Sequence, residues 1–203
     1  MHAGAEPIAP LRAIAEATGV WSVHFDPAWG GPESIEFDKL EDWTARTEPV
    51  IKYYSGTAVY KNTFHVQSVS QGKKTYLDLG IVNYLATVTL NRKKLGVVWT
   101  APWRIDISDA IVRGENKIEI AVTNVWANRL IGDEQEPADI NWQAGDERFK
   151  SGYSIKEFPD WFLKHEKRPS QRRYTFTTWN YFTKDSPLAP SGLIGPVKVL
   201  MQI

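Results

Sequence analysis

The chain has no cysteine among its 203 residues. This absence excludes a disulfide, a thiolate metal site and a cysteine nucleophile, and it leaves the cellular compartment open. An excess of either charge is also lacking, because Lys plus Arg and Asp plus Glu each number 24, so the formal net charge is zero. A neutral chain gives no electrostatic reason to expect a nucleic acid or a membrane surface as partner.

Long hydrophobic runs are missing as well. No stretch of the sequence approaches the roughly 18 consecutive apolar residues of a membrane-spanning helix. Residues 1–20 lack the basic start and the apolar core of a secretory signal peptide, so we expect no such signal there. The sequence therefore predicts neither a nucleic acid nor a membrane as partner.

Tryptophan, in contrast, is abundant, with nine residues in the chain. Trp is favoured where a flat apolar face meets something wet, such as a sugar ring or a protein interface. It also fills the cores of β-sandwiches, and that is the simpler explanation for any single Trp here. A Trp therefore needs a second reason before it counts as a binding residue.

Short segments with strand character recur along the whole chain. The clearest is 116–124, where Ile118, Ile120 and Val122 alternate with polar residues, as in a strand with one buried face. The segments predicted as strands are 20–25, 34–37, 57–66, 74–79, 85–90, 95–99, 103–107, 116–124, 172–178 and 197–201. Turn signals separate them and helical periodicity is scarce, so we predict an all-β fold, an antiparallel β-sandwich.

The chain length fits one domain. Residues 1–19, rich in Ala and Pro, are interpreted as a linker or an edge segment, and residues 20–203 as a single sandwich domain. Residues 128–170 differ from the rest, because they are polar and carry scattered aromatic residues without a clear period. Disordered segments lack aromatic residues, so we expect an irregular but ordered insertion, with a short helix at 159–167.

Several sequence pieces between residues 60 and 124 carry a family resemblance. They are YKNTF at 60–64, LDLG at 77–80, VTLNRKKLG at 88–96, WRIDISD at 103–109 and GENKIEIAVTN at 114–124. Together they resemble the sugar-binding domain of family 2 glycoside hydrolases, which is a galactose-binding-like jelly roll. The chain departs from this family at Arg92, where an Asn-Gly turn is usual. Arg is costlier than Gly at positive φ, which leaves room for another turn type.

Two further pieces narrow the resemblance. WANRLIGDEQ at 126–135 and residues 178–197 are similar to the C-terminal sandwich of α-L-rhamnosidase-like enzymes of glycoside hydrolase family 106, and so are residues 20–44. In such enzymes catalysis resides in a separate α/β barrel, which uses carboxylates and a calcium ion. Nothing in this chain resembles that barrel. The resemblance implies a non-catalytic carbohydrate-binding or accessory domain of a rhamnosidase-like glycoside hydrolase.

The same resemblance sets the expected partners. They are a carbohydrate, for which a rhamnose-containing glycan is one choice, and the catalytic domain of the same parent enzyme. Localisation stays open, and would be periplasmic or extracellular if the parent enzyme is secreted. Two other functions remain open beside the accessory role. The sandwich could only buttress a missing catalytic barrel, or it could be a self-contained hydrolase that uses carboxylates of the insertion.

Trp99 and Trp103 are the first candidate ligand-binding residues. A loop-borne Trp can stack on the apolar face of a sugar, and Pro102 stiffens the turn that carries Trp103. The alternative is that one or both rings pack beneath the loop.

Asn128, Arg129, Asp133 and Glu134 form the second candidate group, directly after the strongest strand. Arg offers a planar fork of donors and carboxylates accept sugar hydroxyls. An internal Arg–carboxylate bridge that anchors the insertion is the slightly favoured alternative for these residues.

Trp179, Asn180 and Tyr181 form the third candidate group. They place two aromatic rings beside an amide, ahead of Lys184 and Asp185. The functional interpretation is a binding edge, and the alternative is contact with a partner domain of a larger enzyme.

Catalytic residues are not assigned. Glycosidases generally need two carboxyl groups about 5–10 Å apart, and the sequence cannot give that spacing for the acidic pairs 133/134, 146/147 and 157/160. No G-x-S-x-G or H-E-x-x-H element is present, so neither a serine nucleophile nor a zinc site is indicated. No cofactor is expected, although a structural calcium ion held by backbone carbonyls and scattered Asp residues stays open.

Overall fold

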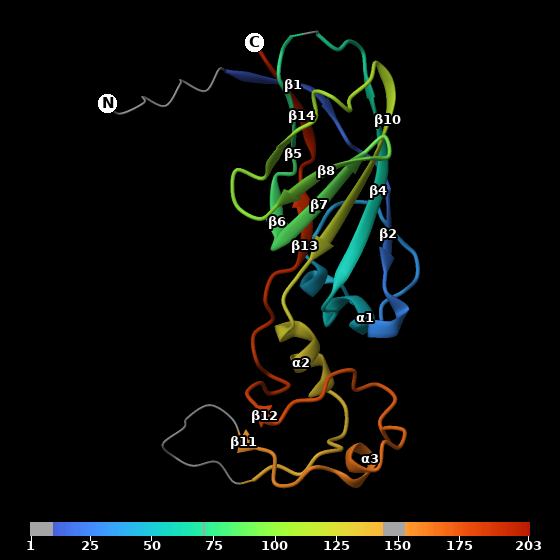
Figure 1. The fold of residues 1–203 in the computed structure, drawn as a ribbon, viewed down its shortest axis with the longest axis vertical. Helices are drawn as coiled ribbons and strands as arrows, with labels where there is room; N and C mark the ends of the chain where they lie inside the picture. Colours follow the sequence, from blue (N-terminus) through green and yellow to red (C-terminus); the bar gives the residue numbers. More distant parts are fainter. Residues whose placement is uncertain (1–9, 71, 144–152) are drawn as a thin grey trace, which may run out of the picture.

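The computed structural model describes residues 10–70, 72–143 and 153–203. Two antiparallel sheets face each other and make a β-sandwich (Figure 1). The larger sheet has the strand order β3-β2-β4-β10-β7-β8, and the smaller has the order β1-β14-β5-β9. The predicted all-β antiparallel sandwich is therefore confirmed.

The strands of the larger sheet are β2 (Trp21–Phe25), β3 (Ile35–Phe37), β4 (Thr57–Val66), β7 (Leu85–Leu90), β8 (Lys93–Val98) and β10 (Gly114–Thr123). Those of the smaller sheet are β1 (Leu11–Glu16), β5 (Thr75–Asp78), β9 (Arg104–Asp106) and β14 (Lys198–Gln202). Two short ladders pair β6 (Ile81–Asn83) with β13 (Gly192–Gly195), and β11 (Tyr153–Ser154) with β12 (Trp179–Asn180). The helical elements are η1 (Pro27–Trp29), η2 (Trp43–Ala45), α1 (Pro49–Lys52), α2 (Ala127–Asp133) and α3 (Asp160–Leu163). None of the helices in the described segments could cross a membrane.

The core lies between the two sheets and follows the period-two pattern. In β10 the side chains of Ile118, Ile120 and Val122 are buried, and the residues between them face outward. An aromatic cluster closes the end of the core near α1. Phe25 lies at its centre, with ring centroids 4.8 Å from Tyr54 and 5.3 Å from Trp43, both in edge-to-face geometry. Large rings packed in this way account for much of the buried apolar area.

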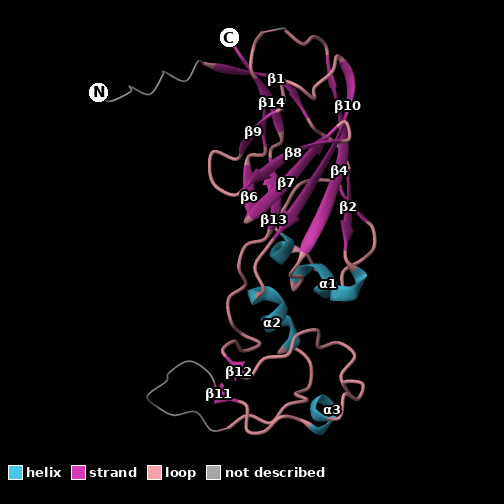
Figure 2. Ribbon diagram, in the orientation of Figure 1, coloured by secondary structure: helices cyan, strands magenta, loops and turns pink. Residues whose placement is uncertain are grey.

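The chain between α2 and β13 leaves the sandwich and forms a separate lobe beyond its end (Figure 2). We call residues 134–190 the excursion. The C-terminus lies at the opposite end of the sandwich (Figure 1). The described residues of the excursion therefore lie away from the sheets, and they contact one another, helix α2 and, through Tyr174, the chain at Gly30 after β2.

Three features differ from the sequence predictions. Residues 172–178 are predicted as a strand, but most of this segment is irregular, because side chains rather than a neighbouring strand take up its backbone groups. The insertion starts with helix α2 instead of irregular chain, and helix α3 is shorter than the expected 159–167. Strand β1 lies within residues 1–19, which are interpreted from the sequence as a linker or an edge segment. It pairs antiparallel with β14 at the edge of the smaller sheet.

The β7–β8 hairpin keeps the type I′ turn in spite of its sequence. Its two central residues, Asn91 and Arg92, have φ values of 48° and 69°, and positive φ at both positions defines this turn type. The Asn91 side chain fixes the turn by accepting a hydrogen bond from Lys117 N (2.9 Å) and donating one to Ala110 O (2.8 Å). Arg92 thus occupies the left-handed region without glycine's freedom.

Arg92→Gly should stabilise the domain. The left-handed backbone costs a non-glycine residue about 1–2 kcal/mol, and the extra chain entropy that Gly loses on folding offsets roughly 0.5–1 kcal/mol of that gain. We expect the free energy of unfolding, measured with urea, to rise by up to about 1 kcal/mol. Lys93→Gly, one residue later in β8, should lower it. A decrease with Arg92→Gly would contradict the assigned turn geometry.

Candidate functional site

Helix α2 connects the sandwich to the excursion, and buried polar side chains hold it in place. Asn128 bridges to the chain ahead of β13 by donating to Ala189 O (2.8 Å) and accepting from Ala189 N (2.8 Å). The backbone N–H of Arg129 donates to Ser55 Oγ at 2.9 Å. Gly132 faces Tyr53 so closely that an added Cβ would lie 2.5 Å from its side chain. The sequence ANRLIGD therefore folds as a helix packed tightly against the end of the sandwich.

Asp133, the last residue of α2, is 2% exposed. Its carboxylate accepts from Arg129 Nε at 2.9 Å, one turn earlier in the helix. The returning limb of the excursion supplies the other donors: Tyr174 N at 3.0 Å, Thr175 N at 2.7 Å and Thr175 Oγ1 at 2.6 Å. One buried carboxylate thus joins the start of the excursion to residues more than forty positions later, and charge-assisted bonds of this kind are the strong ones.

Two more arginines tie the limbs of the excursion together. Arg168 makes a bidentate ion pair with Asp139, through Nε–Oδ2 at 2.6 Å and Nη2–Oδ1 at 3.0 Å. Arg173 donates to Glu134 Oε1 at 3.0 Å and to the carbonyls of Pro137 and Glu136. Arg168 Nη1 also donates to the carbonyls of Arg173 and Thr175. We call these pairs, together with the Asp133 contacts, the arginine network. The network binds backbone groups of residues 173–175 that a neighbouring strand would otherwise pair.

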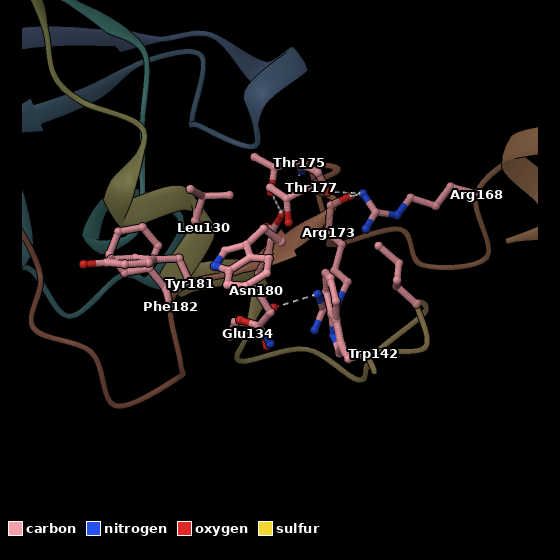
Figure 3. Close-up of a pocket in the computed structure, with 13 residues that line it drawn as sticks. Leu130, Glu134, Trp142, Arg168, Arg173, Thr175, Thr177, Asn180, Tyr181 and Phe182 are labelled. Carbon is pink, nitrogen blue, oxygen red and sulfur yellow. Dashed lines mark hydrogen bonds and ion pairs between the residues drawn. The ribbon is translucent and has the colours of Figure 1, made fainter. Parts of the chain in front are cut away.

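A pocket lies against the arginine network (Figure 3). The residues that line it come from α2, from the chain that follows α2, from the chain between α3 and β12, and from the region of β12. They are Leu130, Asp133, Glu134, Ile140, Trp142, Arg168, Arg173, Thr175, Thr177, Trp179, Asn180, Tyr181 and Phe182. Its free volume is about 30 Å³, above the roughly 10–15 Å³ that one water molecule needs. The pocket is therefore much smaller than the roughly 300–1,000 Å³ of small-molecule sites.

The structure brings the second and third candidate groups together at this pocket. Asp133 and Glu134 line it, and so do Trp179, Asn180 and Tyr181, about 45 positions later in the chain. Asn128 and Arg129 lie beside it in α2, buried and hydrogen-bonded to the chain itself. The polar atoms of Arg129 and Asp133 thus face inward, as in the internal bridge weighed from the sequence. Tyr181, 61% exposed, lies open at the pocket.

Trp99 and Trp103 lie elsewhere, on the sandwich, and are not brought to the pocket. Trp103 is partly buried and packs against the core. Trp99, at 71% exposed, stands at the end of β8. Of the first candidate pair, only Trp99 therefore offers a free ring face.

Sequence reasoning missed a second hollow, at the junction of the sandwich and α2. Asp26, Trp29, Tyr54, Gly56, Thr57, Thr123, Asn124 and Trp126 line it, and its free volume is about 270 Å³. The available signal was a Trp that closely follows the end of a strand in two places, Trp29 after β2 and Trp126 after β10. Nothing in the sequence says that these two strand ends adjoin. Burial raises the pKa of the Tyr54 phenol, and the Asp26 carboxylate adds to that effect.

The carboxylates named as catalytic candidates are placed in three ways. Asp133 and Glu134 belong to the arginine network. Glu157 and Asp160 are exposed, and Asp160 pairs with Lys164 at 2.7 Å. Residues 146 and 147 lie outside the described residues. Within the described segments, no group of three or more His, Asp or Glu side chains could hold a metal ion, and a calcium ion held by backbone carbonyls stays a prediction.

Comparison with known proteins supplies the family. Residues 37–183 match the family described as glycosyl hydrolase 2 galactose-binding domain-like. A curated relative, named "Putative beta-glucuronidase" from Formosa agariphila, is 43% identical over 89% of this chain and 15% of its own length. The structure of a rhamnosidase from Novosphingobium sp. PP1Y superposes with a TM-score of 0.76 at 35% identity, over 97% of this chain and 16% of the rhamnosidase.

A more distant solved structure, Bifidobacterium dentium β-glucuronidase, has a TM-score of 0.52 at 17% identity, covers 93% of this chain and 30% of that one, and shows the fold alone. The chain thus spans about 15% of the length of the curated relative that it matches. These findings confirm the resemblance that the sequence pieces indicate.

Removing the Asp133 carboxylate should release the excursion. Asp133→Ala leaves the buried Arg129 without its partner and two amides without an acceptor, and breaking a buried pair in this way costs about 3–5 kcal/mol. We expect a lower free energy of unfolding in urea, and faster limited proteolysis between residues 134 and 178.

Asp160→Ala is the matched control, because it removes an exposed ion pair worth about 0.3–0.5 kcal/mol. Equal proteolysis of the two variants would show that Asp133 does not hold the excursion.

Proposed function

The chain belongs to the glycosyl hydrolase 2 galactose-binding domain-like family, and on this premise we propose that it is a non-catalytic accessory domain that binds carbohydrate within a larger glycoside hydrolase. The observation that supports the proposal is how little of each relative the chain covers. The chain aligns over 89% and 97% of its own length, but with only 15% and 16% of the two relatives. Most of each relative is thus left for other domains, among them the catalytic one.

The chemistry of the excursion supports a non-catalytic role. A glycosidase acid or nucleophile must reach the glycosidic bond. The carboxylates of Asp133, Glu134 and Asp139 instead accept bonds from arginines of the same chain. They serve as internal anchors. We therefore expect their substitution to disorder the excursion rather than to change a catalytic activity.

Carbohydrate contact is proposed for the exposed aromatic residues of the candidate set. Trp99 and Tyr181 present open ring faces, and Trp179 and Asn180 flank Tyr181 at the pocket. Aromatic rings of this kind meet the C–H face of a sugar, and the amide orients its hydroxyls. The residues at the pocket would be positioned from beneath by Asn128, Arg129, Asp133 and Glu134. A rhamnose-containing glycan is the proposed ligand, in line with the rhamnosidase neighbour.

A second function, that of a buttress for the catalytic domain, is favoured by one face of the excursion. Phe158, Phe162 and Leu163 are exposed there, and the Phe162 ring stacks on Phe176 with centroids 4.6 Å apart. Clustered exposed apolar side chains mark interaction sites. The catalytic domain of the same polypeptide would cover this face.

Purified chain should show a saturable change of tryptophan fluorescence with one member of a panel of rhamnose, galactose, glucuronic acid and rhamnogalacturonan fragments. It should release no reducing sugar from these fragments, and no aglycone from aryl rhamnosides or aryl glucuronides.

A flat response across the panel would overturn carbohydrate binding and favour the buttress, which self-association through the apolar face would then support. Turnover abolished by Glu134→Gln would instead show a self-contained enzyme. Glu119→Gln, on an exposed residue of β10 outside the arginine network, is the control for that variant.

A further inference from the structure

The hollow between Trp29 and Trp126 combines three chain segments at the end of the sandwich. Residues 26–29 follow β2, residues 54–57 lead into β4, and residues 123–126 connect β10 to α2 (Figure 1). Its volume of about 270 Å³ lies just below the roughly 300–1,000 Å³ of small-molecule pockets. The pocket at the arginine network, about 30 Å³, is far too small by comparison.

The two indole rings form a corner. Their centroids are 4.9 Å apart and the ring planes meet at 73°. Trp29 is 37% exposed and Trp126 is 50% exposed, so one ring can offer its face while the other closes the side. A pyranose has a flat C–H face and a polar edge, and the indole face suits the first of these.

Polar groups beside the rings suit the edge of a sugar. Asp26 Oδ1 accepts from Ala28 N at 2.9 Å, and Asp26 Oδ2 has no partner among the described residues. Thr57 Oγ1 and Thr123 Oγ1 lie 2.7 Å apart across the β4–β10 ladder. One hydroxyl proton serves the bond between them, which leaves the other proton for a ligand. A carboxylate acceptor and a hydroxyl donor are what neighbouring sugar hydroxyls need.

The floor of the hollow is fixed before any ligand arrives. Asn124 accepts from Gly56 N at 2.9 Å and donates to Tyr54 O at 2.8 Å. The Tyr54 hydroxyl accepts from Asp26 N at 3.2 Å and donates to Thr57 O at 3.1 Å. These bonds join all three segments, so little conformational entropy is left for binding to remove.

Charge selects the kind of sugar. Asp26 is the only charged residue among those that line the hollow. A carboxylate close to a bound ligand repels an anionic one and accepts hydroxyls from a neutral one. The hollow therefore disfavours a uronic acid.

We propose that this hollow binds one neutral pyranose residue of a carbohydrate, stacked on Trp126 or Trp29 and hydrogen-bonded to Asp26 and the Thr57–Thr123 pair. The inference rests on the proposed carbohydrate-binding function and deepens it, because it gives a site and a class of sugar.

Calorimetric titration of the purified chain with methyl rhamnoside, methyl galactoside and methyl glucuronide tests the site. Wild type should bind a neutral glycoside more tightly than the glucuronide. Trp126→Ala should weaken neutral binding about tenfold or more, as the loss of a buried aromatic contact does. Asp26→Asn keeps the cap on Ala28 N, because Asn caps as well as Asp, and should shift the affinity ratio toward the glucuronide.

Phe162→Ala is the matched control, since it removes an exposed aromatic ring that lines neither the hollow nor the pocket at the arginine network and should leave this binding unchanged. If Trp126→Ala and Asp26→Asn bind as wild type while Trp99→Ala or Tyr181→Ala loses affinity, this site is wrong and the proposed function stands. If wild type binds none of the three glycosides, the proposed function fails and the site with it. Tighter binding of the glucuronide by wild type would overturn the charge argument.

Discussion

The buried carboxylate of Asp133 is the contact on which the excursion depends. It is 2% exposed, and it accepts from the arginine of its own helix and from two consecutive backbone amides of the returning limb. A buried charge is tolerated only when it is paired and hydrogen-bonded. Here Arg129 of the same helix supplies the ion pair, and the amides of Tyr174 and Thr175 supply hydrogen bonds. Arg168 and Arg173 extend the same arrangement outward. Ion pairs and hydrogen bonds to carboxylates thereby hold a polar segment outside the two sheets, beside the ring stack of Phe162 on Phe176.

This arrangement divides the molecule into a scaffold and the surfaces that it presents. The sandwich supplies a rigid body through the period-two burial of β4 and β10 and through the aromatic cluster around Phe25. Helix α2 is fixed to that body by Asn128 and by the close approach at Gly132. The exposed rings of Trp29 and Trp126 line the hollow at this junction, and that of Tyr181 lies at the pocket on the excursion. Binding surfaces on rigid supports lose little entropy on association, as an accessory domain needs.

The sequence predicted the sheets better than the site, for physical reasons. Alternation at 116–124 is local information, so β10 could be recognised from its own residues. The segment 172–178 has strand composition but lacks a strand beside it, because Asp133 and Arg168 take its backbone groups. The candidate residues near 133 and near 180 were proposed as two separate groups, and only the folded chain shows that members of both line one pocket. The Trp29–Trp126 hollow was missed because three strand ends create it.

The most direct test of the account follows the indole N–H signals of the nine tryptophans by NMR while a rhamnose-containing oligosaccharide is added. The account predicts saturable shifts of exposed indoles, those of Trp29 and Trp126 foremost, with the buried Trp21 and Trp43 unmoved. It also predicts an intact oligosaccharide at the end of the titration. Spectra that do not change, or an oligosaccharide that is cleaved by the purified chain, would contradict an accessory carbohydrate-binding domain.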